Sequence, residues 1–448
     1  MEEILIKAGQ LVLSLSILVV LHELGHFIPA KLFKTRVEKF YLFFDPWFSL
    51  FKFKKGDTEY GVGWLPLGGY VKISGMIDES MDKDQMEKEP EPWEFRSKPA
   101  WQRLIIMVGG VVVNLILACF IYAMTMMAWG EEKLPVENMH YGLECVDSLA
   151  FDLGFEHGDK ILRVGETEVK YYSDIMPMLL LETADKVTVE RNGSTMDLDY
   201  TPDAVARIIR NSAPLFVPRA PIIIASVQEG SPADNAGFQR GDKLLKIGSD
   251  TLVYFQDLAP ILDTTKGKEL TAVLEREGRQ IELAVTPSED GKLGFYRAGS
   301  NLSEMKEFGI VETEKIKYGF IASFPAGVNK AMDKLGSYIK QFKLILNPET
   351  EAYKQVGGFG AMAKMFSPTW DWLRFWEMTA FLSIMLAFMN ILPIPALDGG
   401  HVMFLLYEII TRRKPNEKFM EYAQMAGMIL LLGLLLLANG NDVLKIFQ

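Results

Sequence analysis

The chain is poor in cysteine and histidine, and it has no excess of basic residues. Only two of its 448 residues are cysteines, and Cys119 lies inside an apolar run whereas Cys145 lies outside one. A disulfide between them is therefore not expected, and a disulfide framework is excluded. The formal net charge of −11 argues against a nucleic-acid partner. The first apolar run opens with Glu2 and Glu3 instead of a basic segment, which is not typical of a cleaved signal peptide.

The chain does, however, contain several long apolar runs. It is 49% hydrophobic and 23% charged, which is too apolar for an ordinary soluble protein and too charged for one that lies wholly in a membrane. Four segments are apolar enough to cross a bilayer. They are Ile4–Ala30, about Leu104–Trp129, about Phe375–Leu392 and a shorter one at about Ala426–Ala438. We therefore expect several spans plus a substantial aqueous part.

Clusters of lysine and arginine give these spans a direction, because such clusters mark the cytoplasmic side. One cluster follows the first span, one precedes the second and one follows the third. Their members are Lys31, Lys34, Arg36, Lys39, Lys52, Lys54 and Lys55; Lys98 and Arg103; and Arg412, Arg413, Lys414 and Lys418. The N-terminus, the stretch 130–370 and the C-terminus are then expected outside.

The first span contains the pattern HExxH, with His22, Glu23 and His26. On a helix the two histidines lie on one face, one turn apart, and can bind one metal ion. Glu23 can then act as general base toward a water on that metal. The alternative is a chance match with structural histidines, but ionisable side chains inside a span are costly and mark function by default. The pattern indicates hydrolysis within a bilayer.

A third ligand is expected where the third span ends, in the run from Asn390 to Gly399. The first and third spans run in the same direction, and both motifs come late in them, so they share a depth near the cytoplasmic face. Asp398 can therefore complete a set of two histidines and a carboxylate, which leaves a fourth position to water. Pro393 and Pro395 must break the helix before it. The alternative for Asp398 is an ordinary turn at a helix end.

Two further polar residues lie near this motif. The amide of Asn390 could bind the backbone of an unwound substrate, or it could make an interhelical hydrogen bond. His401 could be a ligand, but we expect it to be a polar residue that faces the cavity.

Residues 36–75 are rich in aromatic and β-branched residues, and Phe40–Phe44, Phe48–Phe53 and Tyr60–Ile73 are predicted strands. A hairpin beside the metal site could offer a free edge to a substrate strand. We expect Gly61, Gly63, Pro66, Gly68 and Gly69 to hold the substrate extended, because glycine permits close backbone approach. The alternative is a plain amphipathic hairpin on the membrane surface.

A repeat marks the outer region. Ser148–Gly165 and Ser231–Gly248 match at a constant offset of 83 positions, so two copies of a small β-rich domain are expected. Their Gly-Asp-Lys core resembles PDZ domains, which bind peptide ends by strand addition. A standard carboxylate-binding loop is not evident, so a size filter or gating lid is an equal alternative. His157 aligns with Arg240 and is expected at the surface.

Together these motifs resemble the site-2 protease family of intramembrane metalloproteases, in its bacterial form with two PDZ domains. The resemblance rests on the HExxH pattern, on Pro66–Lys72, on Gln102-Arg103 with Gly109-Gly110 and Asn114, on the tandem repeat, and on Asn390-x-x-Pro-x-Pro-x-Leu-Asp-Gly399. It implies a zinc enzyme of the bacterial inner membrane that cleaves single-span substrates, such as anti-sigma factors trimmed by a first protease, and remnant signal peptides. One departure is Gly357-Gly-Phe-Gly360, where many relatives have a proline-containing turn.

The predicted fold is a multi-pass α-helical membrane protein with four transmembrane helices, a membrane-associated β-hairpin and two β-rich PDZ domains outside. The expected boundaries are 1–35 for the first span, 36–75 for the hairpin, 76–100 for a cytoplasmic linker, 101–129 for the second span, 130–212 and 213–300 for the PDZ domains, 301–370 for an amphipathic helical region, 371–402 for the third span, 403–422 for a cytoplasmic loop and 423–448 for the fourth span and C-terminus.

Two rival functions remain. A catalytically silent membrane scaffold would use its PDZ pair to collect partners, and its HExxH residues would not matter. A metal transporter would need polar groups along a path through several spans, whereas here they cluster at one depth. A site of two histidines and one aspartate also accepts iron, cobalt or manganese, and zinc is favoured by the motif and by the resemblance.

Overall fold

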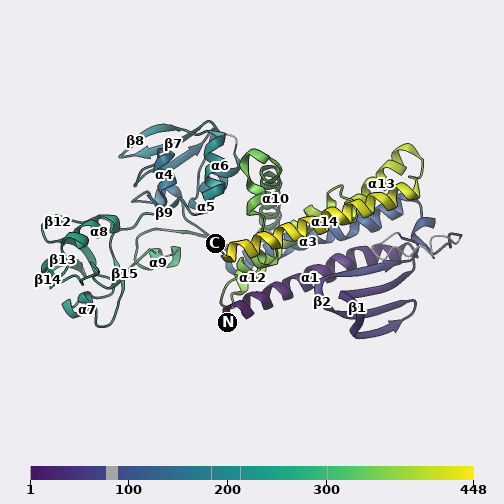
Figure 1. Ribbon diagram of the computed structural model, residues 1–448, viewed down its shortest axis with the longest axis horizontal. Helices are drawn as coiled ribbons and strands as arrows, with labels where there is room; N and C mark the ends of the chain where they lie inside the picture. The colour runs from purple at the N-terminus through teal and green to yellow at the C-terminus, as the bar shows by residue number, and fades with distance from the viewer. Residues whose placement is uncertain (1, 77–88, 183, 212, 300, 448) are drawn as a thin grey trace. The chain divides into compact units, whose positions relative to one another are not determined.

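The computed structural model describes residues 2–76, 89–182, 184–211, 213–299 and 301–447. The chain forms two units (Figure 1). The first, here called the membrane unit, consists of 1–130, 317–346 and 353–448, and the second, the β unit, consists of 131–316 and 347–352. Much of the linker expected at 76–100 falls on 77–88, which lies outside the described residues.

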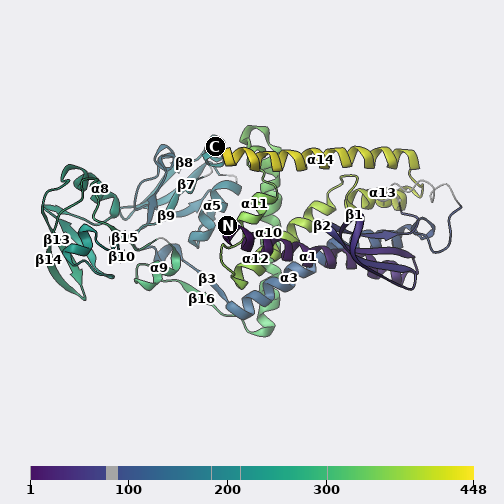
Figure 2. The ribbon, with the colours of Figure 1, turned by 60° about the horizontal axis from the view of Figure 1, so that its bottom comes forward.

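Among the described residues of the membrane unit, four helices are long and apolar enough to cross a membrane. They are α1 (Glu2–Leu32), α3 (Ala100–Trp129), α12 (Trp372–Ile391) and α14 (Glu417–Phe447), the long helix that ends at the C-terminus in Figure 2. They cover the four predicted spans and extend past most of their ends, because a helix continues through the headgroup layer after the apolar pattern stops. Helix α3 packs against α1, α12 and α10 (Phe320–Leu346).

Helices α1 and α3 approach each other through glycine. A Cβ atom added to Gly25 would lie 2.4 Å from the carbonyl oxygen of Gly109, so neither helix has room for a side chain at the crossing. Small residues allow such close approach between helices in a membrane. The crossing brings the HExxH turn of α1 directly against α3.

A further helix, α13 (Asp398–Thr411), follows the break after α12, and the chain then turns into α14. A loop was expected at 403–422, but residues 403–411 belong to α13 and residues 417–422 to α14. The helix forms because its apolar side chains have a surface to cover: Val402 and Leu405 are buried in a core shared with α1, α3 and the hairpin.

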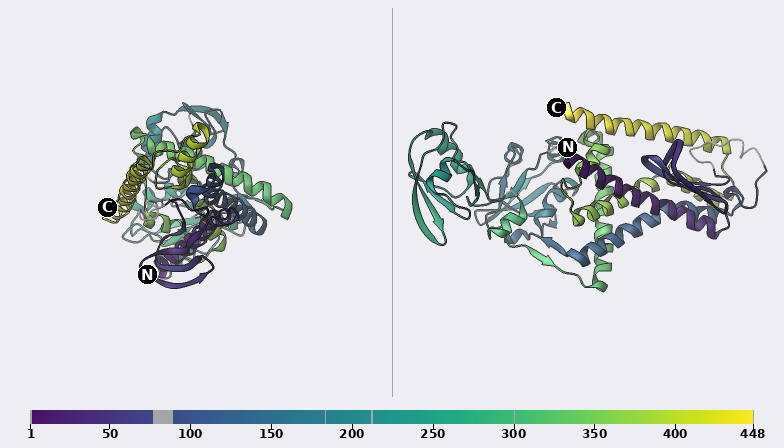
Figure 3. Two further views of the ribbon diagram at one scale, coloured as in Figure 1. Left: turned by 90° about the vertical axis from the view of Figure 1, so that its right-hand side faces the viewer. Right: turned by 90° about the horizontal axis from the view of Figure 1, so that it is seen from below.

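The hairpin consists of β1 (Val37–Lys55) and β2 (Thr58–Ile73), and it contacts α1 (Figure 3). Both strands bend, so that they form four arms. The pairing shows this, since Tyr41 pairs with Tyr70 on one side and with Gly61 on the other. The arms lie in the order 69–73, 37–42, 58–63 and 49–55. Within the described part of the chain, the arm 69–73 is therefore at an edge of the sheet.

The structure differs here from the three expected strands. Phe40–Phe44 and Phe48–Phe53 belong to one strand, β1, and the register shifts between them. Asp45 holds the bend, since its carboxylate accepts hydrogen bonds from the hydroxyl groups of Tyr70, at 2.9 Å, and Ser49, at 3.0 Å. The contact with Tyr70, 25 residues along the chain, helps the strand continue where the sequence predicted two separate strands.

The β unit contains two four-stranded sheets with equivalent strand orders, β6-β5-β7-β8 and β12-β11-β13-β14, each with its own core. The first copy consists of α4 (Ser148–Asp152), β5 (Lys160–Val164), β6 (Thr167–Glu168), α5 (Tyr172–Leu181), β7 (Lys186–Arg191) and β8 (Ser194–Asp199). The second consists of α7 (Pro232–Ala236), β11 (Lys243–Ile247), β12 (Asp250–Thr251), α8 (Phe255–Thr264), β13 (Leu270–Arg276) and β14 (Arg279–Val285).

Short elements complete both units. Three two-stranded pairs are β3 (Glu131–Lys133) with β16 (Glu314–Ile316), β4 (Leu143–Cys145) with β9 (Phe216–Pro218), and β10 (Ile224–Val227) with β15 (Phe295–Arg297). The remaining helices are α6 (Pro202–Asn211), α9 (Leu302–Glu307) and, in the membrane unit, α11 (Phe359–Lys364). Both cysteines are free thiols.

Candidate metal centre

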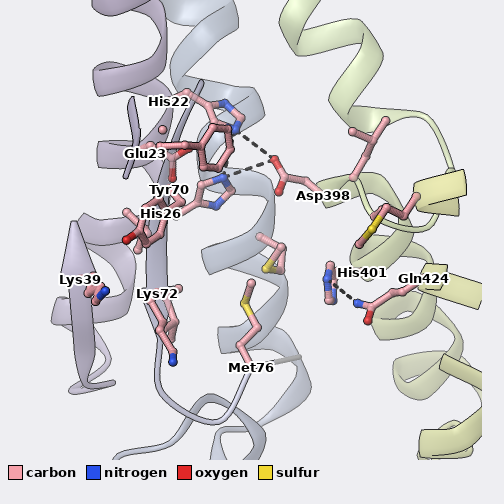
Figure 4. A pocket seen from close by; sticks show the side chains of 18 of the residues that line it. His22, Glu23, His26, Lys39, Tyr70, Lys72, Met76, Asp398, His401 and Gln424 are labelled. Atoms are coloured by element: carbon pink, nitrogen blue, oxygen red, sulfur yellow. Dashed lines mark hydrogen bonds and ion pairs between the residues drawn. The ribbon is translucent and has the colours of Figure 1, made fainter. Parts of the chain in front are cut away.

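Three side chains from two helices converge inside the membrane unit. His22 and His26 lie one turn apart on α1, and Asp398 is the first residue of α13. The two Nε2 atoms are 3.3 Å apart, and each lies 3.3 Å from Asp398 Oδ2 (Figure 4). Among the described residues, this is the single group of three histidine, cysteine or acidic side chains whose donor atoms cluster closely enough to hold one metal ion.

This triangle of donor atoms has the size that a tetrahedral zinc ion requires. Zinc bonds of about 2.0–2.1 Å at tetrahedral angles place neighbouring donor atoms about 3.3 Å apart. Asp398 Oδ2 is buried and accepts no hydrogen bond from the described residues. A buried carboxylate oxygen is costly unless a cation or a donor compensates its charge. The donor set therefore fits zinc, with a fourth position left for water.

The backbone of α3 fixes the ring of His26. His26 Nδ1 lies 2.8 Å from the carbonyl oxygen of Ile106. Because a carbonyl only accepts, Nδ1 carries the proton and Nε2 keeps its lone pair for a metal. Gly110 lies on the same face of α3, and a Cβ atom there would be 2.4 Å from His26 Nε2 and 2.6 Å from His22 Cε1. Glycine at this position lets both imidazoles lie against α3.

The break between α12 and α13 places the side chain of Asp398 next to the two histidines. Pro393 and Pro395 lie in this break, as the sequence predicts. Ala396 has a φ of +79°, a left-handed conformation that is strained for alanine. The segment packs tightly on α14, since a Cβ atom added to Gly427 would lie only 1.7 Å from the carbonyl oxygen of Pro395. This tight packing maintains the strained turn.

A cavity of about 650 Å³ opens beside the three donors, and Glu23 lies on its wall beside His22 (Figure 4). The hairpin contributes its edge arm to this wall, through Gly69, Tyr70, Val71, Lys72 and Ile73. Helix α14 contributes Gln424, Met425 and Met428. A strand edge, a carboxylate and the donor cluster thus face one space.

The structure separates the predicted substrate-binding residues into two groups. Asn390 lies at the end of α12 with its amide nitrogen 3.2 Å from His22 Nε2, and Gly69 lines the cavity. Gly61 and Gly63 pack inside the hairpin instead, where a Cβ atom would meet the ring of Tyr41 at 2.4 Å or the carbonyl oxygen of Phe44 at 2.1 Å. Pro66 and Gly68 are not among the described residues that line the cavity.

The other histidines lie apart from the donor cluster. His401 is on the cavity wall, where its Nε2 lies 3.0 Å from the side-chain nitrogen of Gln424. His157, in the β unit, is half-buried, and its Nδ1 accepts a hydrogen bond from the backbone of Cys145 at 3.2 Å. Burial, together with the charge of Arg219, lowers the pKa of His157.

The roles of several residues that shape the site were not predicted, although Gly109-Gly110 was named as part of the resemblance. Gly109-Gly110 gave a visible signal, since paired small residues in an apolar span indicate a close helix contact. Ile106 gave none, because it acts through its backbone oxygen. The hydrogen bond between Tyr70 and Asp45 depends on strand register, which no local pattern reveals; burial, together with that carboxylate, raises the pKa of the Tyr70 phenol.

Comparison with known proteins agrees with this geometry. The sequence matches the description of peptidase family M50 over residues 10–434. The chain belongs to peptidase family M50. It is 26% identical to a Neisseria meningitidis protein whose name describes a zinc metalloprotease, over 97% of this chain and 98% of the relative. It is also 26% identical to the regulator of sigma E protease of Haemophilus influenzae, over 98% of each chain, and to the regulator of sigma-E protease RseP of Salmonella typhimurium, over 99% of each.

Membership of the M50 family confirms the resemblance to site-2 proteases that the motifs indicated. As an M50 peptidase, the chain is a zinc-dependent metalloprotease, and its apolar helices and relatives make it an inner-membrane protein that acts on membrane-bound substrates.

Proposed function

We propose that this M50 peptidase cleaves the transmembrane segments of single-span membrane proteins, such as anti-sigma factors and remnant signal peptides. His22, His26 and Asp398 hold the zinc ion, and Glu23 is the general base. The observation that carries this proposal is the 3.3 Å triangle of donor atoms inside a bundle of membrane-length helices. Two of the three ligands, His22 and His26, lie on the membrane-length helix α1, which suits substrates that lie in the bilayer.

The chemistry at this site follows from the positions of the side chains. A zinc ion held by His22, His26 and Asp398 would polarise the peptide carbonyl and would lower the pKa of a bound water. Glu23, next to His22 on the cavity wall, takes a proton from the attacking water and returns it to the leaving amide nitrogen. Asn390 lies close enough to the ligands to donate a hydrogen bond to the backbone of the bound substrate.

The hairpin makes the scissile bond accessible. A transmembrane helix satisfies its backbone groups internally, so it must unwind before water can attack. The arm 69–73 lies at the sheet edge and lines the cavity, so an extended segment can add to it as a strand and regain backbone hydrogen bonds. This arrangement supports Gly69 as a substrate-binding residue more strongly than Gly61, Gly63, Pro66 or Gly68.

We also propose that the two copies in the β unit are PDZ domains that limit which proteins reach the site. In the second copy, α8 and the segment Asp290–Tyr296 line a cavity of about 780 Å³, which is large enough for part of an extended peptide. This favours peptide binding by that copy, alongside a role as size filter.

A membrane-tethered reporter tests the proposed activity. The full-length protein should cut the reporter within its transmembrane segment, and mass spectrometry of the fragments should place the cut there. Glu23→Gln should leave the reporter intact, because it removes the general base. Unchanged cleavage by Glu23→Gln, as the silent-scaffold alternative requires, would refute the proposal, as would a cut located only outside the membrane.

A further inference from the structure

One face of α3 lies behind the two imidazole rings. Ile106, Gly110 and Asn114 are spaced four residues apart, so they lie on that face. They match His26 and His22 in antiparallel order: Ile106 contacts His26, Gly110 faces both rings, and Asn114 contacts His22. Each histidine thus has a partner on α3 for the ring nitrogen that points away from Asp398.

The two partners differ in kind. His26 Nδ1 donates to a backbone carbonyl, which every residue at position 106 would supply. His22 Nδ1 instead lies 3.0 Å from the side-chain nitrogen of Asn114, a residue with no exposed surface. The partner of His22 Nδ1 is therefore a side chain, whereas Asn390 contacts the other ring nitrogen, Nε2.

One polar atom of the Asn114 amide lacks a hydrogen bond within the described part of the chain. Its Oδ1 atom is buried and has no hydrogen-bond partner among the described residues, whereas its Nδ2 atom faces His22 Nδ1. If Nδ2 donated to Nδ1, the proton of neutral His22 would lie on Nε2, the atom aimed at Asp398 and His26. A metal on Nε2 requires the opposite tautomer, with the proton on Nδ1 and an acceptor beside it.

A half-turn of the amide about its last torsion exchanges its oxygen and nitrogen with little change in shape. We propose that Asn114 is a positioning residue that turns Oδ1 toward His22, accepts the Nδ1 proton, and so presents Nε2 to the metal. This inference rests on the proposed zinc ligands. The backbone of Asn114 is held separately, since the Ser383 hydroxyl donates to its carbonyl oxygen at 2.7 Å. Side-chain substitutions therefore test the amide while leaving that contact in place.

The experiment measures zinc affinity of the full-length protein in detergent, by competition with a chelator, so that it does not depend on cleavage. Asn114→Leu keeps similar bulk but removes the acceptor, and its zinc affinity should fall roughly 10–100-fold. Asn114→Asp keeps an acceptor and should bind zinc within about threefold of the unmodified protein. If the Leu variant does not fold, Asn114→Ala removes the same acceptor and takes its place.

The matched control is Thr379→Val, since Thr379 on α12 is equally buried and its hydroxyl donates to Ser14 at 3.0 Å. Its zinc affinity should be unchanged. With cobalt in place of zinc, the visible absorption bands should shift for Asn114→Leu and persist for Asn114→Asp.

Two outcomes overturn the inference separately from the proposed function. If His22→Ala abolishes zinc binding while Asn114→Leu binds normally, or if Asn114→Asp loses as much affinity as Asn114→Leu, the role of Asn114 is wrong and the ligand set stands. If His22→Ala itself binds zinc normally, the ligand set is wrong and the inference fails with it.

Discussion

At the residue scale, the metal centre depends on the ligands and also on glycine, whose lack of a side chain leaves room for them. The HExxH pattern and the proximity of Asp398 to it were predictable from the sequence, and the structure places Asp398 3.3 Å from both histidines. Gly110 was visible only as part of a glycine pair. Its place behind both rings depends on how α3 crosses α1, and no pattern within either helix specifies that.

Gly110→Ala should therefore disrupt the centre without touching a ligand. The added methyl group would lie 2.4 Å from His26 Nε2, so one or both rings must move. Zinc content should fall well below that of the unmodified protein, and cleavage should fall with it; metal analysis of the purified protein measures the first. Gly433→Ala is the matched control, since no atom lies within 4 Å of a Cβ there. A Gly110→Ala protein with full zinc content would contradict this account.

At the element scale, the hairpin was predicted as a sheet but not in its observed form. Enrichment in aromatic and β-branched residues identified the strand-forming segments. The bend at Asp45, however, depends on the hydroxyl group of Ser49 on the same strand and on that of Tyr70, which reaches the carboxylate from the neighbouring strand. The helix α13 was also not predicted in full. It continues through residue 411 because α3 and the hairpin cover its apolar face.

Tyr70→Phe should weaken substrate use while leaving the metal in place. It removes a hydrogen bond to a carboxylate, which is worth roughly 1.5–3 kcal/mol, and so loosens the arm that lines the cavity. We expect KM for a membrane peptide to rise roughly tenfold with zinc content unchanged. Tyr60→Phe is the matched control on the same hairpin, since Tyr60 stacks on Phe53 through its ring, which the substitution keeps. Equal kinetics for Tyr70→Phe and Tyr60→Phe would contradict the proposed role of this arm.

At the scale of the whole molecule, four membrane-length helices and a separate β unit were predictable, because apolar length and an 83-residue repeat are strong signals. The ends of the helices were less predictable from the sequence, since α14 extends well beyond the apolar stretch 426–438. The orientation in the membrane rests on the distribution of basic residues alone.

Cysteine labelling tests that orientation. In a chain whose native cysteines have been replaced, Lys414→Cys should react with a membrane-impermeant maleimide only from the cytoplasmic side. Ser194→Cys, on the exposed strand β8, should react only from outside. The two positions serve as controls for each other. Labelling of both from the same side would contradict the proposed topology.

The most direct test of the central claim measures zinc content and cleavage together in the purified full-length protein, with a single-span peptide in lipid nanodiscs as substrate. Glu23→Gln should keep one zinc ion per chain while the cleavage rate falls roughly 10²–10⁴-fold. Asp398→Asn should lose both zinc and cleavage, because it weakens one of three ligands. A Glu23→Gln protein that cleaves at the unmodified rate, or an Asp398→Asn protein that keeps full zinc content and activity, would contradict the account.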